Sequence, residues 1–161
     1  MKTVHPIPPL YNEESRVLIL GSFPSVRSRE SMFFYGHPRN RFWQVIAAIL
    51  GKEVPTRVEK KRELLLSSGI AVWDVIGSCE IVGSADSSIK NAMPNDIREI
   101  LSVADIRAIF VNGKTAEKYY NKYIRDRVGR STVSLPSTSP ANAAVSLDEL
   151  ICEWGVIGEF L

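Results

Sequence analysis

The sequence has few of the residues that hold metal ions or form disulfide bonds. Its 161 residues include only two cysteines and two histidines. Cys79 and Cys152 lie far apart, and neither His5 nor His37 stands at the spacing of a metal site. The sequence therefore predicts reduced thiols and no structural zinc ion, iron–sulfur cluster or other cofactor.

Long apolar runs and an excess of charge of one sign are also missing. No stretch approaches the roughly 18 apolar residues of a membrane span, and residues 1–15 lack the pattern of a signal peptide. We therefore expect a cytoplasmic protein that does not enter a membrane. The net charge is only +2, so any attraction to phosphate groups must come from local placement of charge.

What is present is the composition of an ordinary globular protein, with 45% hydrophobic and 24% charged residues. The length suits one domain with a single sizeable core, and no internal repeat or low-complexity segment divides it. We expect a single domain over residues 1–161. Nothing in the sequence indicates a dimer interface, so a monomer is expected.

Short apolar runs alternate with helical segments along the chain. The runs predict four strands, at residues 16–20, 69–75, 106–111 and 132–135. Apolar spacing predicts helices at residues 41–50, 96–101 and 115–123, and a last helix after Ser146, which forms a capping box with Glu149. This order indicates an α/β fold, a three-layer α/β/α sandwich with a central, mostly parallel four-stranded sheet.

Small and polar residues follow the predicted strands. Ligands of open parallel sheets bind outside the carboxyl ends of the strands, so these residues should meet in one site. They are residues 21–25, Asp74, residues 112–114 and residues 136–140. Their hydroxyls and backbone N–H groups suit a nucleic-acid backbone, and Lys114 adds positive charge. Each loop alone is equally compatible with an ordinary turn, so the coincidence of the four favours a site.

Five short segments carry a more specific signal. In order they are Gly-Ser-Phe-Pro-Ser at 21–25, His-Pro-Arg-Asn-Arg-Phe-Trp at 37–43, Trp-Asp-Val at 73–75, Phe-Val-Asn-Gly-Lys at 110–114 and Leu-Pro-Ser-Thr-Ser-Pro-Ala at 135–141. Through them nearly the whole chain resembles the uracil-DNA glycosylase superfamily, and within it the hypoxanthine-DNA glycosylase branch. The resemblance implies an enzyme that flips a damaged base out of DNA and removes it.

The resemblance also implies a catalytic residue. Uracil- and mismatch-specific relatives place an Asp or Asn before the proline of the first loop, where it positions the attacking water; here that residue is Phe23, which cannot do so. The branch with this substitution uses the Asn of the Asn-x-Phe-Trp segment, which is Asn40 here. Its amide can hold a water by hydrogen bonds. Asn40 is also a good N-cap for the predicted helix that follows.

Aromatic and amide side chains are candidates for holding the flipped base. Phe23 and Tyr35 offer rings for stacking, and the resemblance places Tyr35 at the stacking position, although core packing is the alternative for each ring. Asn112 carries the donor and the acceptor that the O6 and N1 edge of hypoxanthine requires. Gly21 and Ser22 complete the predicted base-binding set.

Other residues are predicted to contact the DNA backbone. The resemblance implies that residues 136–140 press into the minor groove and clamp the phosphates beside the flipped nucleotide. The predicted DNA contacts are Ser25, Arg39, Lys114, Pro136, Ser137, Thr138, Ser139 and Pro140. A solvated face is the alternative for the arginines. Asp74 and His37 receive no definite role from the sequence.

The predicted function is removal of hypoxanthine from deoxyinosine in DNA, which leaves an abasic site for base-excision repair. DNA containing a deaminated base is then the partner, and no metal is needed. Uracil is the alternative substrate, because the shape of the pocket decides which base fits. Two further alternatives are a nucleic-acid-binding domain without activity and a hydrolase of free nucleosides.

Overall fold

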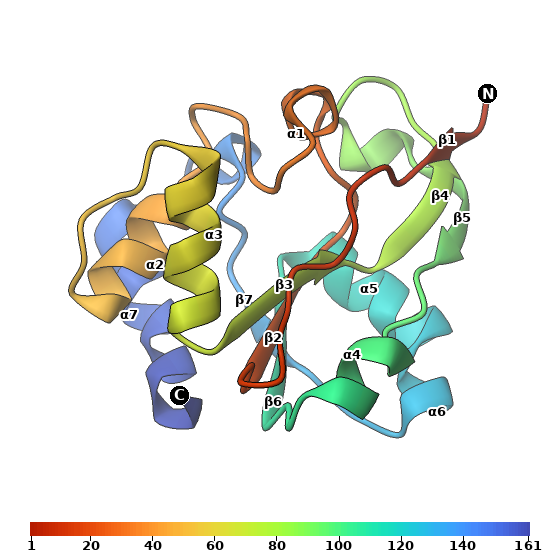
Figure 1. Cartoon of the computed structure of the whole chain (residues 1–161). Coiled ribbons are helices and arrows are strands. Elements are labelled where there is room, and N and C mark those ends of the chain that lie inside the picture. The colour runs from red at the N-terminus through yellow and green to blue at the C-terminus, as the bar shows by residue number, and fades with distance from the viewer.

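A parallel sheet forms the centre of the protein in the computed structural model, which describes residues 1–161 (Figure 1). Its strands are β2 (Val17–Gly21), β3 (Ile70–Asp74), β6 (Ala108–Asn112) and β7 (Val133–Leu135). They are ordered β3-β2-β6-β7, and every neighbouring pair is parallel. The four predicted strands and their parallel arrangement are confirmed.

Helices cover both faces of this sheet and give the predicted three layers (Figure 1). Side chains alternate along β2, so that Val17 and Ile19 join one hydrophobic cluster while Leu18 and Leu20 join the other. The first cluster includes side chains of α2 (Phe42–Leu50), α3 (Val58–Ser67) and α7 (Leu147–Trp154). The second includes α4 (Arg98–Val103) and α5 (Lys114–Tyr123), with α6 (Arg125–Val128) packed beside it.

Capping explains where several helices begin and end. The Ser146 Oγ accepts a hydrogen bond from the Glu149 N–H at 3.1 Å, so the predicted cap of α7 is present. Helix α2 ends at Gly51, whose φ of 65° is left-handed. The helix predicted at residues 96–101 starts later, at Arg98, because Asp96 lies outside it and its carboxylate accepts the Arg98 N–H.

A second, antiparallel sheet is an addition that the sequence did not predict. It contains β1 (Thr3–Val4), β4 (Ile76–Glu80) and β5 (Lys90–Pro94) in the order β1-β4-β5. Helices α1 (Val26–Ser31) and α3 were also not predicted. Three short 3-10 helices complete the chain: η1 (Asp86–Ser88), η2 (Pro140–Asn142) and η3 (Gly155–Phe160).

The N-terminal segment crosses the open edge of the parallel sheet (Figure 1). Leu10 and Val72 exchange two backbone hydrogen bonds, of 3.0 and 2.9 Å, and the Trp73 indole N–H donates to the Ile7 carbonyl. The His5 N–H donates to the Gly77 carbonyl just beyond β3. These bonds carry His5 to the carboxyl end of β3. None of the helices combines the length and apolar character that a membrane crossing requires.

Candidate active site

A cleft of about 1130 Å³ lies at the carboxyl ends of the parallel strands. Its floor includes Gly21 at the end of β2, Asp74 at the end of β3 and Asn112 at the end of β6. The volume is sufficient for a nucleotide. The predicted residues that line it are Gly21, Ser22, Phe23, Ser25, Tyr35, Asn40, Asn112, Lys114, Pro136, Ser137, Thr138, Ser139 and Pro140. Arg39 does not line the cleft and is exposed on a loop beside it.

Asn40 lines the cleft and also supports the start of α2. Its side-chain Oδ1 accepts a hydrogen bond from the Phe42 N–H at 2.9 Å. The Asn40 N–H donates to the His37 carbonyl, so the segment before the helix forms a tight turn. The amide Nδ2 makes no hydrogen bond within the chain. The N-cap residue of α2 is Arg41, and Asn40 instead supports the first turn through its bond to the Phe42 N–H. This support and a position in the cleft are compatible, because they use different atoms of one amide.

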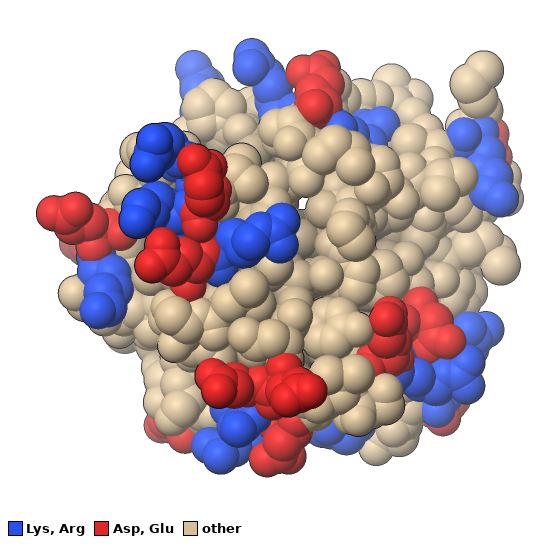
Figure 2. Space-filling model, in the orientation of Figure 1, with Lys and Arg blue, Asp and Glu red and all other residues tan.

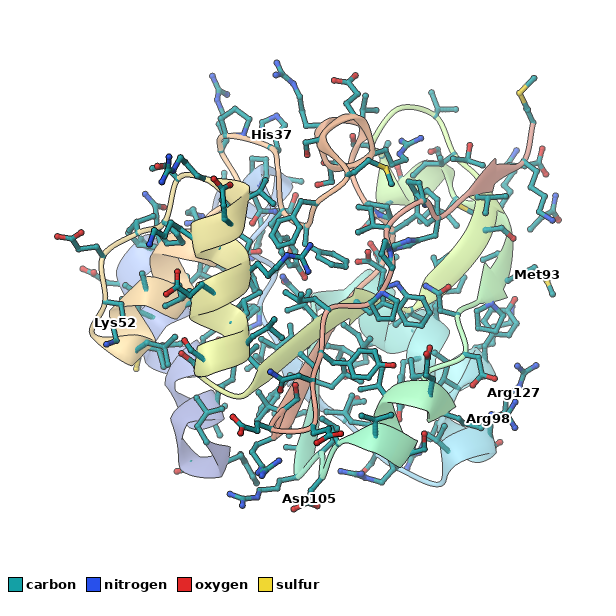
Figure 3. All side chains as sticks on the ribbon, viewed as in Figure 1. His37, Lys52, Met93, Arg98, Asp105 and Arg127 are labelled. Atoms are coloured by element: carbon teal, nitrogen blue, oxygen red, sulfur yellow. The ribbon has the colours of Figure 1, made fainter.

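The segment that carries Asn40 is attached to the loop after β7 by Arg41. The Arg41 N–H donates to the Thr138 carbonyl at 3.0 Å, and its guanidinium donates to the carbonyls of Asn142 and Val145. His37 supports the same segment, because its Nδ1 accepts the Arg39 N–H at 3.1 Å. Figure 3 shows His37 at the opposite end of the molecule from Asp105, which precedes β6.

Asn112 anchors the loop of residues 136–140. Its Nδ2 donates to the Thr138 Oγ1 at 3.0 Å, and its Oδ1 accepts the Thr138 N–H at 3.1 Å. Thr138 is fully buried, and the Trp154 indole N–H donates to the Pro136 carbonyl at 2.9 Å. Each polar atom of the Asn112 amide thus makes one bond to the loop, and the contact of Asn112 with the base stays a prediction.

Tyr35 brings a buried hydroxyl to the wall of the cleft. Its ring stacks on Phe42, with centroids 4.0 Å apart and planes at 15°, so one face of the ring is already covered. Its backbone has a φ of 51°, which is unusual for a residue with a side chain. The hydroxyl makes no hydrogen bond of good geometry. Burial raises the pKa of Tyr35 above its ordinary value, the nearby Asp74 raises it further, and the side chain of Asn112 counteracts part of this rise.

Phe23 is buried in the cleft wall by contacts on two sides. The His5 ring meets it edge-on at 5.8 Å, and the Arg29 guanidinium lies over it at 5.6 Å from the centroid. Arg29 also donates to the carbonyls of Pro24 and Gly83. The structure therefore uses Arg29 to join the first loop to residues 82–88.

Residues 82–88, between β4 and β5, form a wall of the cleft that sequence reasoning missed. The Ser22 hydroxyl donates to the Asp86 carboxylate at 3.0 Å, and the Val26 N–H donates to the Ser84 Oγ at 2.9 Å. Desolvation raises the pKa of Asp86. The sequence gives no signal for the contact between Ser22 and Asp86, because the two residues lie 64 positions apart and share no motif.

A second missed feature is a buried pair of His5 and Asp74. The His5 Nε2 lies 2.7 Å from the Asp74 Oδ2, and the side chains are only 2% and 6% exposed. The His5 Nδ1 accepts the Ile7 N–H at 3.2 Å, so the ring hydrogen sits on Nε2 and points at the carboxylate. His5 lies in the segment before β2, the first strand of the central sheet in chain order. The residues around His5 form no motif that would predict a functional site.

Positive charge in the cleft is local. Lys114 and Lys118 line it from α5, and Lys114 is the first residue of that helix. On the face shown in Figure 2, Lys and Arg side chains are mixed with Asp and Glu side chains at the left and along the lower edge, with uncharged surface between these groups. This agrees with a net charge of +2 and with attraction to phosphate through a few placed side chains.

Comparison with known proteins assigns the family. The model of the uracil DNA glycosylase superfamily matches residues 8–153. The chain belongs to this superfamily. The matched residues include all four parallel strands and every residue that lines the cleft.

Two curated relatives have similar lengths. A hypoxanthine DNA glycosylase of Methanosarcina acetivorans is 34% identical over 141 residues, which cover 86% of this chain and 88% of the relative. A hypoxanthine DNA glycosylase of Methanosarcina barkeri is 31% identical over 137 residues, which cover 84% and 85%. The chain is thus a member of a superfamily of DNA glycosylases, with DNA as the substrate.

A solved structure shares the fold. It is a solution NMR structure from Methanosarcina acetivorans, of a protein provisionally named a uracil DNA glycosylase. The TM-score is 0.82 at 31% identity, and the likeness covers 98% of this chain and 96% of the other. The uracil-DNA glycosylase-like fold predicted from the five segments is therefore confirmed.

Proposed function

We propose that this protein is a monofunctional glycosylase that removes hypoxanthine from deoxyinosine in DNA by hydrolysis and leaves an abasic site. One observation carries the proposal: Asn40 lines the cleft, while the first loop carries Phe23 where a polar residue would be needed to hold water. Phe23 has no polar group to hold water, so Asn40 takes that task. Two relatives named hypoxanthine DNA glycosylase support the choice of base.

The chemistry requires a water held at the sugar. The bond between C1′ and N9 breaks with its electron pair leaving on the base, the water oxygen bonds to the oxocarbenium-like C1′, and the proton that the water loses ends on the released base. The Asn40 Oδ1 already accepts the Phe42 N–H, which fixes the amide, and the Nδ2 is free to contact the water. An amide is a weak base, so Asn40 acts by positioning and by stabilising charge.

The remaining predicted residues divide between the base and the backbone. Phe23 and Tyr35 wall the space for the flipped base, together with Gly21 and Ser22. The loop of residues 136–140 contacts the phosphates beside that nucleotide. Ser25 and Lys114 line the same cleft and add polar and positive contacts, and Arg39 contacts the backbone from outside the cleft. Asn112 serves this binding by holding Thr138 in place.

The test is excision from matched duplexes that carry one deoxyinosine, deoxyuridine or deoxyxanthosine, incubated in EDTA and then cleaved at abasic sites with alkali. We expect cleavage at deoxyinosine, and loss of it in Asn40→Ala. Cleavage mainly at deoxyuridine would favour uracil, the base in the provisional name of the structural relative. Binding to all three without cleavage would indicate a binding domain without activity.

A further inference from the structure

Helix α5 carries three lysines in a row that begins in the cleft and continues beyond it. Lys114, Lys118 and Lys122 are four residues apart, so they follow one another along one side of the helix. Lys114 and Lys118 line the cleft, whereas Lys122 lies outside it. All three residues are exposed, and none forms an ion pair with a carboxylate of the chain. We call these three residues the lysine row.

The charges of the lysine row do not stabilise the helix that carries them. Like charges four residues apart repel each other across one turn, so the row contains two unfavourable pairs. Lys114 is also the first residue of α5, where the helix dipole disfavours a positive charge. The only acidic residue of α5, Glu117, makes no ion pair with the row. A pattern of charge that opposes folding and has no partner in the chain indicates an anionic ligand.

Two tyrosines hold the outer lysines of the row in place. The Lys118 Nζ lies over the Tyr119 ring at 5.2 Å from its centroid, and the Lys122 Nζ lies over the Tyr123 ring at 5.1 Å. The two rings are parallel, with planes at 6° and centroids 6.1 Å apart. Contact of an ammonium group with a ring restricts a flexible side chain, which lowers the entropy that it loses on binding. The two ammonium groups are thus arranged in advance along one side of α5.

We propose that the lysine row binds phosphates of the DNA strand that carries the flipped nucleotide, on one side of that nucleotide. Lys114 and Lys122 are eight residues apart, which is about 12 Å along a helix. Phosphates of one strand of B-DNA follow each other at about 3.4 Å along the axis, so the row faces about three to four of them.

The position of the row explains how a strand would reach it. Its first two members line the cleft, so the backbone on one side of a nucleotide that enters the cleft continues towards Lys122. Phosphate contacts of this kind hold DNA irrespective of its sequence. The row therefore adds affinity and sets the length of DNA that the protein covers, and it has no part in the choice of base.

The first test is the dependence of binding on salt. An undamaged duplex is titrated by fluorescence anisotropy at several salt concentrations with wild type and with Lys118→Gln/Lys122→Gln. Each lost phosphate contact lowers the slope of log Kd against log salt by about 0.9, so the slope should fall by about 1.8 in the double variant. Its Tm should not fall, because glutamine is a good helix former and the repulsion is relieved.

Lys52→Gln/Lys61→Gln is the matched control. It removes the same charge, and the Lys61 Nζ also lies over an aromatic ring, that of Trp43, at 5.1 Å. Lys52 follows α2 and Lys61 lies on α3, two helices that pack on the other face of the sheet. Figure 3 shows Lys52 on the opposite side of the molecule from Arg127, which lies on α6 directly after α5.

The control should keep the slope within about 0.5 of wild type. An equal fall of the slope in both double variants would mean that net charge alone accounts for it, and would overturn the proposal. So would a wild-type slope in Lys118→Gln/Lys122→Gln. The outcome is separable from the proposed function, because the duplex contains no damaged base: excision of a base other than hypoxanthine would refute that function and leave this result unchanged.

The second test varies the length of DNA on each side of the damaged base. Duplexes with one 2′-fluoro-deoxyinosine, which resists cleavage, end close to that nucleotide on the 5′ or the 3′ side or extend well beyond it. Extending one of the two sides past about four base pairs, the reach of the row, should strengthen binding by wild type about tenfold. Lys118→Gln/Lys122→Gln should lose most of this gain. The same gain in wild type and in the double variant would contradict the proposal.

Discussion

The Oδ1 of Asn40 accepts the N–H of Phe42, so the residue proposed to hold the water is fixed by the helix that it precedes. Capping and catalysis usually compete as explanations for an Asn at such a position. Here one atom of the amide serves the helix and the other is left for the cleft. The bond removes rotational freedom of the amide, which would strengthen the proposed hold on water.

Replacing Asn40 separates these two roles. Asn40→Ala should lower the single-turnover rate of excision about 10²- to 10³-fold, the typical cost of one lost polar group that acts in the transition state. It should also cost about 1 kcal/mol of stability, because the Phe42 N–H loses its bond to the Asn40 Oδ1. Asn40→Ser should keep the bond to the Phe42 N–H and the Tm but lose the rate, since its side chain is shorter and has no second polar group to reach the water. A Ser variant with near wild-type rate would contradict the catalytic role.

Gly21→Ala tests the crowding at the end of β2. The new methyl group would lie 2.4 Å from the Asp74 Oδ1, so the carboxylate or the strand must move. We expect a loss of about 1–3 kcal/mol in the free energy of unfolding, measured in urea, with weaker binding of the base. Gly158→Ala is the control, because a methyl group there meets no atom within 4 Å, and its stability should stay within about 0.5 kcal/mol.

Variants of Thr138 test whether its bonds to Asn112 hold the loop of residues 136–140 in place. Thr138→Val keeps the shape but removes the acceptor of the Asn112 Nδ2, leaving that group unpaired. We expect a loss of about 1–2 kcal/mol in stability and weaker binding of a duplex, with the N–H bond to Asn112 retained. Thr138→Ser keeps the hydroxyl and should bind DNA almost as wild type does. Equal binding by both variants would show that the hydroxyl has no part in ordering the loop.

The two cysteines should react differently with thiol reagents. Cys152 is exposed, whereas Cys79 is buried in the second cluster, and burial raises the pKa of its thiol. Only the thiolate reacts, so a disulfide reagent at pH 8 should modify one thiol rapidly in the native protein and the second only in denaturant. Cys152→Ser should abolish the rapid phase. Rapid modification of two thiols in the native state would disagree with the packing of Cys79.

The parallel sheet could be predicted because its strands carry strong local signals. Val17–Leu20 and Ile109–Val111 are buried on both faces, so they read as continuous apolar runs, and turn residues end each run. The last helix was predicted for a similar local reason, the Ser146 cap. Helix α3 was missed because it is largely polar and only Leu65 is fully buried in it.

The second sheet and part of the cleft depend on contacts that no local pattern reports. β1 has two residues, and its partner β4 carries irregular register with β5. The bond between His5 and Asp74 joins residues 69 positions apart. Asn112 could be placed at the edge of the sheet from its position after a strand, but the direction of its amide is set by Thr138, which arrives from a distant loop.

Arg41 links the movement of two walls of the cleft. Its backbone and guanidinium bind the Thr138, Asn142 and Val145 carbonyls, so the turn that carries Asn40 and the loop after β7 share one set of bonds. Any displacement of that loop by a phosphate is passed to Asn40. In the proposed reaction, contacts between the DNA backbone and this loop would therefore help to align the water held by Asn40 with C1′.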